Sequence, residues 1–229
     1  MEQKTTVLWD GVLEELGTDL IRFVCAEDKD IDLERGLRFA DAELEALHLD
    51  KGHGRAVLVD KLIKVFRRDG QEELMLVHVE ELADEYLPER VFKRFTRVFD
   101  RCDVPVWVLA VVVDTVGEGG TGRLNCFSKV DAFGKENVRL EYPVCRVADY
   151  SDAELIASDN AFALVLLAAK KGLLKGRVTE GELLEEKVKV ARMVLGKEGL
   201  TDRKREMILA FLNERVVLDD EGMELVTYF

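Results

Sequence analysis

Two apolar runs separated by a turn signal place the strongest constraint on the fold. Residues 56–66 and 74–80 are rich in valine, leucine and isoleucine, and Asp69 and Gly70 lie between them. Branched aliphatic residues favour strands, and Asp-Gly is among the commonest pairs in tight turns. The stretch therefore predicts a β-hairpin.

The segments around this hairpin predict alternating helices and strands. Apolar residues recur at helical spacing over residues 9–24, which predicts an amphipathic first helix. Pro88 precedes a second helical pattern whose apolar side is rich in phenylalanine, and residues 104–113 then form an unbroken apolar strand except for one proline. This order predicts an α/β fold.

The remainder of the chain has helical patterns. Ser151 with Glu154, and Thr179 with Glu182, have the spacing of capping boxes, which predicts helices beginning at both places. We therefore expect two parts, a mixed α/β domain over residues 1–150 and a helical C-terminal extension over residues 151–229.

Composition and charge exclude several classes of protein. The chain of 229 residues has 48% hydrophobic and 34% charged residues, which is typical of a folded globular protein. Its net charge of −13 argues against broad, non-specific attraction to nucleic acid. The longest apolar run, at residues 104–113, is about half the ~20 residues that a membrane-spanning helix requires, and no secretory signal is visible. We expect a cytoplasmic protein that does not associate with membranes.

Two acidic residues in the hairpin are candidates for a metal site. Asp60 lies in the first predicted strand and Glu80 in the second. Carboxylates on adjacent strands can share a divalent cation, provided that both point to the same face of the sheet. A two-residue loop of Asp69 and Gly70 would place them on opposite faces. A three-residue loop that also includes Gln71 would set them directly opposite each other on one face. We predict this register, reached either through that loop or through a bulge that shifts the pairing by one.

Several short motifs resemble those of the recombination-promoting nuclease (Rpn) family in the PD-(D/E)XK nuclease superfamily. They are WDGVLEEL in the first helix, VDKLIKV and MLVHVEE in the hairpin, ERVFKRFTRVFDR in the next helix and SDNAFALVLLAAK in the C-terminal part. The resemblance implies a PD-(D/E)XK nuclease-like core that hydrolyses DNA with Mg²⁺ or Mn²⁺. It implies that Asp60 and Glu80 hold the metal, that Glu15 is a supporting acid, and that the protein acts in recombination or phage defence.

The chain departs from the family at one position of this motif. Family members usually carry Gln or Lys two residues after the strand glutamate, and here that position is Leu82. A leucine can neither orient water nor neutralise a phosphate. Lys64, on the strand face of Asp60, and His78, on that of Glu80, are candidate substitutes. The alternatives are a solvated strand lysine and a core histidine whose hydrogen bonds are satisfied.

Arginines form a stripe along the helix that follows the hairpin. Arg90, Arg94 and Arg97 recur at helical spacing opposite the phenylalanines, with Arg101 one turn further on. We expect an exposed basic face that binds DNA phosphates, or else a solvated face paired with acidic neighbours.

Two hypotheses follow from these observations. The first is an Rpn-type, metal-dependent DNA endonuclease. The second is a catalytically inactive relative that binds nucleic acid or a protein partner, with homodimer formation as one form of the latter.

Overall fold

The computed structural model describes residues 2–26, 28–40, 57–116 and 124–218, with residues 2–5 and 57–59 described for their backbone alone. Ala56, the start of the expected first strand, lies outside this part. The chain divides into two compact units, Met1–Phe23 with Val147–Phe229, and Val24–Arg146. This division differs from the expected domains at residues 1–23, which cluster with the C-terminal helices and not with the sheet.

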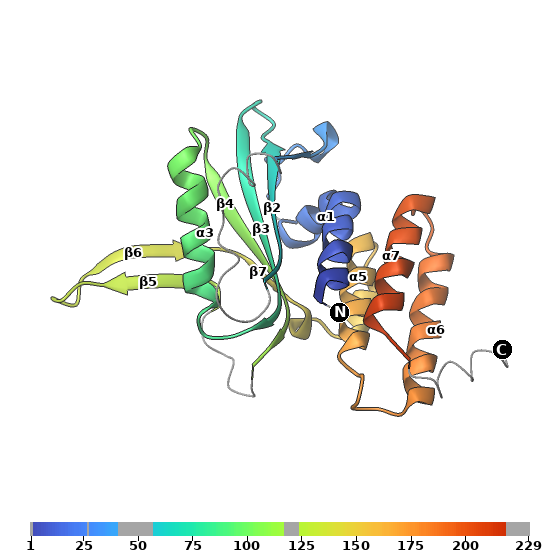
Figure 1. Cartoon of the computed structure of the whole chain (residues 1–229). Helices are drawn as coiled ribbons and strands as arrows, with labels where there is room; N and C mark the ends of the chain where they lie inside the picture. Colours follow the sequence, from blue (N-terminus) through green and yellow to red (C-terminus); the bar gives the residue numbers. More distant parts are fainter. Residues whose placement is uncertain (1, 27, 41–56, 117–123, 219–229) are drawn as a thin grey trace. The chain divides into compact units, whose positions relative to one another are not determined.

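A five-stranded mixed sheet forms the centre of the unit Val24–Arg146, in the order β1-β2-β3-β4-β7 (Figure 1). The first three strands are antiparallel to one another, and β3, β4 and β7 are parallel. The strands are β1 (Arg38–Phe39), β2 (Val57–Phe66), β3 (Glu72–Ala83), β4 (Val106–Thr115) and β7 (Val144–Arg146). A 3-10 helix, η1 (Leu33–Arg35), precedes β1. The mixed sheet with its helices confirms the predicted α/β class.

The predicted hairpin is formed by β2 and β3. Arg67 N–H donates to the carbonyl of Gln71 at 2.8 Å, so the loop has three residues, Arg68, Asp69 and Gly70. Gly70 has a φ of 92°, a left-handed conformation that glycine adopts without strain. The loop has the predicted length but begins one residue earlier than expected.

Helix α3 (Leu87–Arg101) packs on one face of this sheet (Figure 1). Pro88 lies in its first turn, where the missing N–H costs no hydrogen bond. The buried side of the helix meets apolar residues of three strands, and this core includes Leu62, Leu76, Val91, Val98 and Val108. The helix was predicted from the sequence, and Val91 and Val98 of its expected apolar side are buried, but Phe99 of that side is 60% exposed.

A second, two-stranded sheet was not predicted. Strands β5 (Cys126–Val130) and β6 (Glu136–Glu141) pair antiparallel and form a hairpin beside α3 (Figure 1). The rings of Phe92 in α3 and Phe127 in β5 stack with their centroids 4.3 Å apart. This stack fastens the hairpin to the helix.

The other unit is helical. Its elements are α1 (Glu2–Val24), η2 (Val147–Asp149), α4 (Asp152–Ala157), α5 (Ala161–Gly172), α6 (Glu180–Gly196) and α7 (Asp202–Arg215). Trp9 of α1 packs edge-on against Phe211 of α7, with ring centroids 4.8 Å apart. Both predicted capping boxes are present, at the starts of α4 and α6. Among the described helices, none is both long and apolar enough to cross a membrane.

Candidate functional site

Asp60 and Glu80 lie on the same face of the sheet, as predicted. The pairing differs from the prediction, however, because Asp60 is opposite His78 and not opposite Glu80. Glu80 instead pairs with Val57, beyond an irregularity in β2 between Val57 and Val59. His78 and Glu80 are alternate residues of β3, so all three polar side chains share the face that α3 covers.

His78 bridges the two carboxylates. Its Nδ1 lies 2.6 Å from Oδ1 of Asp60, and its Nε2 lies 3.0 Å from Oε2 of Glu80. The side chains of His78 and Glu80 are completely buried. When both carboxyl groups are ionised they can only accept hydrogen bonds, so both ring nitrogens then donate and the imidazole carries its second proton.

Two arginines of α3 bind the remaining oxygens of these carboxylates. Arg94 Nε donates to Oδ2 of Asp60 at 2.6 Å, and Arg90 donates to Oε1 of Glu80. Arg90 also donates to Asp84 Oδ1 at 2.8 Å. The spacing of four residues places both arginines on one side of the helix, toward the sheet.

Together these groups form a continuous series of contacts, which we call the ion-pair chain: Arg94, Asp60, His78, Glu80, Arg90 and Asp84. It contains three carboxylates and, with His78 protonated, three cations. The series is therefore electrically balanced, which is the condition under which charges can be buried without a large penalty.

The pKa shifts agree with this balance. Burial by itself would raise the pKa of Asp60, but His78 and Arg94 outweigh it and hold that pKa below its ordinary value. Burial would also lower the pKa of His78, yet the Asp60 and Glu80 carboxylates raise it above its ordinary value. Each group favours the charged form of the other.

The arrangement does not fit a shared divalent cation. Each of the four carboxylate oxygens of Asp60 and Glu80 already accepts a hydrogen bond from a cationic group of the same chain. A metal ion would have to displace an imidazolium and two guanidinium groups to reach them. Within the described residues, no group of three or more His, Cys, Asp or Glu side chains is placed to hold a metal.

The predicted exposed arginine face is wrong in two of its three residues. Arg94 is buried, Arg90 is half-buried, and Arg97 is exposed. Helical spacing correctly predicted that the three arginines share one side of α3. Arg90 and Arg94 nevertheless point toward the sheet, because they form ion pairs there with Glu80 and Asp60. The expected contact of Arg90 and Arg94 with DNA phosphates therefore has no exposed guanidinium groups to make it.

The other candidate residues are not members of the ion-pair chain. Lys64 is half-buried and its ammonium lies 3.6 Å from Glu72. Glu15 belongs to the helical unit, where Arg203 Nε lies 2.8 Å from its carboxylate. Leu82 of β3 is 36% exposed, and it pairs with Asp114 of β4.

Asp84 is a member of the chain that sequence reasoning missed. It lies just after β3, and its carboxylate also accepts the backbone N–H of Tyr86 at 3.0 Å, directly before α3. An aspartate at the entrance of a helix is a recognisable turn signal. Its second role, as partner of Arg90, depends on how the helix packs on the sheet and has no local sequence pattern.

Comparisons of the chain with protein-family models, with curated proteins and with solved structures gave no match.

Proposed function

We propose that this chain is a nuclease-like α/β protein that does not hydrolyse phosphodiesters and acts as a binding module for another protein. The order of hairpin, helix and strand within the unit Val24–Arg146 supports a PD-(D/E)XK-like core, as do the two acidic residues on one face of the hairpin.

The observation that carries the proposal is that every carboxylate oxygen of Asp60 and Glu80 is already bound by a cationic side chain of the same chain. A metal-dependent nuclease needs carboxylate oxygens free to bind the ion that activates water and stabilises charge on the phosphate. Here His78, Arg90 and Arg94 take up those oxygens. Leu82 adds no group able to act on water in the place where the related nucleases carry Gln or Lys.

The charge distribution favours a protein partner over nucleic acid. The net charge is −13, and two arginines of the expected basic stripe neutralise carboxylates of the same chain. DNA binding depends on exposed Lys and Arg that release counterions from phosphates. Arg97 and Arg101, the two exposed arginines of that stripe, supply little of that attraction.

A Mg²⁺- or Mn²⁺-dependent endonuclease is the second candidate. It is favoured by the placement of Asp60 and Glu80 on one sheet face, close enough for a single imidazole to touch both. This candidate requires the ion-pair chain to open when metal and DNA bind.

A plasmid-nicking assay in Mg²⁺ and in Mn²⁺, with titration calorimetry of each ion, separates the two candidates. The proposal expects neither cleavage nor metal-dependent heat from the wild-type protein. Cleavage that disappears in a folded Asp60→Asn variant and persists in Asp100→Asn, at an exposed position of α3, would overturn it. Salt-sensitive binding of duplex DNA that Arg97→Glu abolishes would also overturn the preference for a protein partner.

A further inference from the structure

Two arginines at the β1 edge of the five-stranded sheet lie over one aromatic ring. Arg35 ends η1 and Arg38 begins β1, and both residues are exposed. Their guanidinium carbons lie 3.9 Å and 5.3 Å from the centroid of the Phe66 ring, so the two carbons are at most about 9 Å apart. Phe66 itself is only 2% exposed. The ring therefore fixes both guanidinium groups within reach of a single tetrahedral anion.

Neither of these arginines has a carboxylate partner in the part of the chain that the structure describes. Asp32 Oδ1 accepts the backbone N–H of Arg35 at 3.3 Å instead, and the exposed Glu34 forms no ion pair with either arginine. Arg67 of the same unit is different, because it pairs with Asp28 at 2.7 Å. The N–H donors of the two guanidinium groups over Phe66 thus remain for an anion from outside the chain.

A third cation lies beside them. Lys64 of β2 is the direct cross-strand partner of Arg38, so two like charges face each other on one side of the sheet. Such a pair is destabilising unless an anion offsets it. Glu72 lies 3.6 Å from the Lys64 ammonium and offsets one of the three charges. Two positive charges are left without a contacting carboxylate, which is the charge that a phosphomonoester dianion would balance.

The backbone that carries the two arginines is held in place at both ends. Asp32 N–H donates to the carbonyl of Phe66 at 2.7 Å, and Ala40 N–H donates to the carbonyl of Leu62 at 2.8 Å. Between these points Gly36, with a φ of 79°, allows the chain to turn from η1 into β1. A guanidinium stacked on a ring keeps its N–H donors in its own plane, where they can still bind a ligand. Little conformational entropy is then lost when an anion binds.

We propose that Arg35, Arg38 and Lys64 bind the phosphoryl dianion of a phosphomonoester. Planar guanidinium groups donate pairs of hydrogen bonds to phosphate oxygens, and the lysine adds a compact charge. A carboxylate, or a phosphodiester of nucleic acid, carries one negative charge and would offset only one of the two positive charges. The site is independent of the proposed function, because it contains no residue of the ion-pair chain. The phosphoryl group can belong to a free small molecule or to a phosphorylated side chain of a protein, and the probes below separate these sources.

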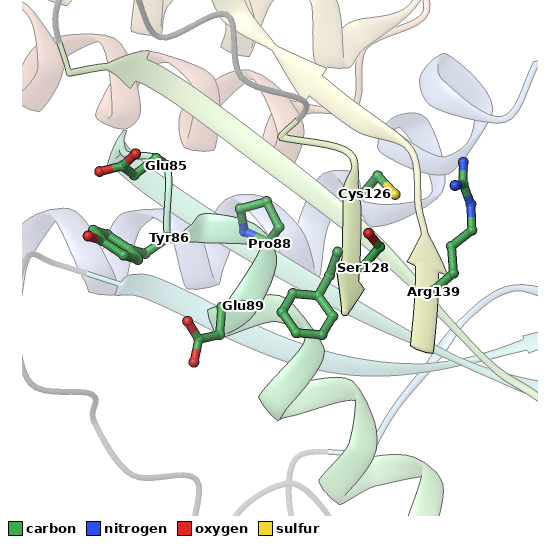
Figure 2. Close-up of a pocket in the computed structure, with 8 residues that line it drawn as sticks. Glu85, Tyr86, Pro88, Glu89, Cys126, Ser128 and Arg139 are labelled. Carbon is green, nitrogen blue, oxygen red and sulfur yellow. The ribbon is translucent and has the colours of Figure 1, made fainter. Parts of the chain in front are cut away.

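The pocket between α3 and the β5–β6 hairpin is a poorer place for an anion. Figure 2 shows Glu85 and Glu89 on one side of it and Arg139 on the other. Arg139 already pairs with Glu136 and Glu141. Its guanidinium is therefore neutralised within the chain, and Arg139→Gln serves as the matched control for the arginines over Phe66.

NMR of the backbone amides of the full chain tests the site. The probes are inorganic phosphate, a phosphoserine peptide of otherwise neutral sequence, its unphosphorylated form, and acetate at equal ionic strength. We expect saturable shifts at Arg35, Arg38 and Phe66 with both phosphates, and binding at least about 10-fold weaker with acetate, because charge-assisted hydrogen bonds are lost. The unphosphorylated peptide should cause no shifts there. Tighter binding of the phosphopeptide than of inorganic phosphate would assign the group to a protein, and equal binding would assign it to a free small molecule. Shifts that are absent, or equal with acetate, would overturn the proposal.

Variants test whether the named side chains make the contact. Arg35→Gln combined with Arg38→Gln should weaken phosphate binding at least about 10-fold, whereas Arg139→Gln should leave it unchanged. Arg35→Lys keeps the charge but not the planar fork, so it should weaken binding less than Arg35→Gln does. Lys64→Gln, outside the stack on Phe66, decides the point if uncovering that ring unfolds the double variant, and it too should weaken binding. Phosphate binding that survives in folded variants at all three positions would refute the assignment.

Discussion

The completely buried ring of His78 lies between two carboxylates, with Nδ1 2.6 Å from Asp60 and Nε2 3.0 Å from Glu80. A neutral imidazole has only one N–H, so it would leave one of the two carboxylates facing a lone pair. The histidine is therefore a structural cation, and it occupies the position between the carboxylates that a metal ion would need.

The ionisation state of His78 is the first prediction. We expect both of its nitrogens to remain protonated at neutral pH, because the neighbouring carboxylates raise its pKa above the ordinary value. Heteronuclear NMR of the imidazole nitrogens measures this directly, with His78→Asn to assign the signals. A neutral ring at pH 7 would mean that the ion-pair chain is broken in solution.

The pH dependence of stability is the second prediction. The pKa of His78 is raised by folding, so its contribution is full below the unfolded value of about 6.5 and is lost as pH rises through the folded value. The pKa of Asp60 is lowered, so its contribution is full above about 3.9 and is lost as pH falls through the folded value. The two contributions are therefore both present between about pH 4 and 6.5.

Urea unfolding across this range, on the wild type and on His78→Gln, is the measurement. The stability difference between the two proteins should be largest inside the window and should shrink on both sides of it. A constant difference from pH 4 to 9 would show that His78 acts through packing and not through charge.

The third prediction concerns the loss of one partner from the ion-pair chain. Asp60→Ala leaves Arg94 and His78 as buried cations without their shared carboxylate, which should cost about 3–5 kcal/mol of unfolding free energy. Asp100→Ala, on the exposed side of α3, should change stability by less than about 0.5 kcal/mol. Denaturant unfolding of both variants decides the point. An equally small loss of stability in both variants would mean that Arg94 and His78 bind other partners or water once Asp60 is removed.

A double-mutant cycle gives the fourth prediction. Glu80→Gln and Arg90→Gln remove opposite charges that contact each other within the ion-pair chain. Because each single change leaves a buried charge uncompensated, the double variant should lose less stability than the sum of the two singles, with a coupling of about 1–3 kcal/mol. If the losses of stability in the two single variants simply added up in the double variant, the Arg90–Glu80 contact would contribute nothing to stability, and Arg90 would be held by Asp84 alone.

Regular patterns in the sequence predicted the central hairpin, the helix and strand that follow it, the first helix and two of the C-terminal helices. Runs of branched aliphatic residues and the Asp-Gly turn placed β2 and β3, and the position of Pro88 placed the start of α3. Each of these signals is local, because strand and helix periodicity depend on neighbouring residues. The capping boxes of α4 and α6 were found for the same reason.

The features that escaped prediction depend on contacts between distant residues. Helical spacing shows that Arg90 and Arg94 share a side of α3 but not whether their guanidinium groups reach water or the sheet. The pairing of Asp60 with His78 was missed because starting the loop one residue earlier shifts every cross-strand partner by two. The β5–β6 hairpin has short strands, and Phe127 of β5 stacks on Phe92 of α3, which is distant in the sequence.

The fifth prediction is that Phe92 anchors this hairpin. A two-stranded hairpin is marginally stable alone in water, and here one strand is fastened by the stack of Phe127 on Phe92, with ring planes 16° apart. Phe92→Ala should therefore raise amide hydrogen exchange in β5 and β6 by roughly 10-fold to 100-fold, about 1.4–2.8 kcal/mol of local stability. Exchange in β3 and β4 should change much less, because their core is made by other residues of α3. Phe99→Ala, which removes an exposed ring from the same helix, is the control and should leave the hairpin protected. If exchange rose equally in the central sheet, the stack would be part of the global core, and the hairpin could not be described as a separately anchored element.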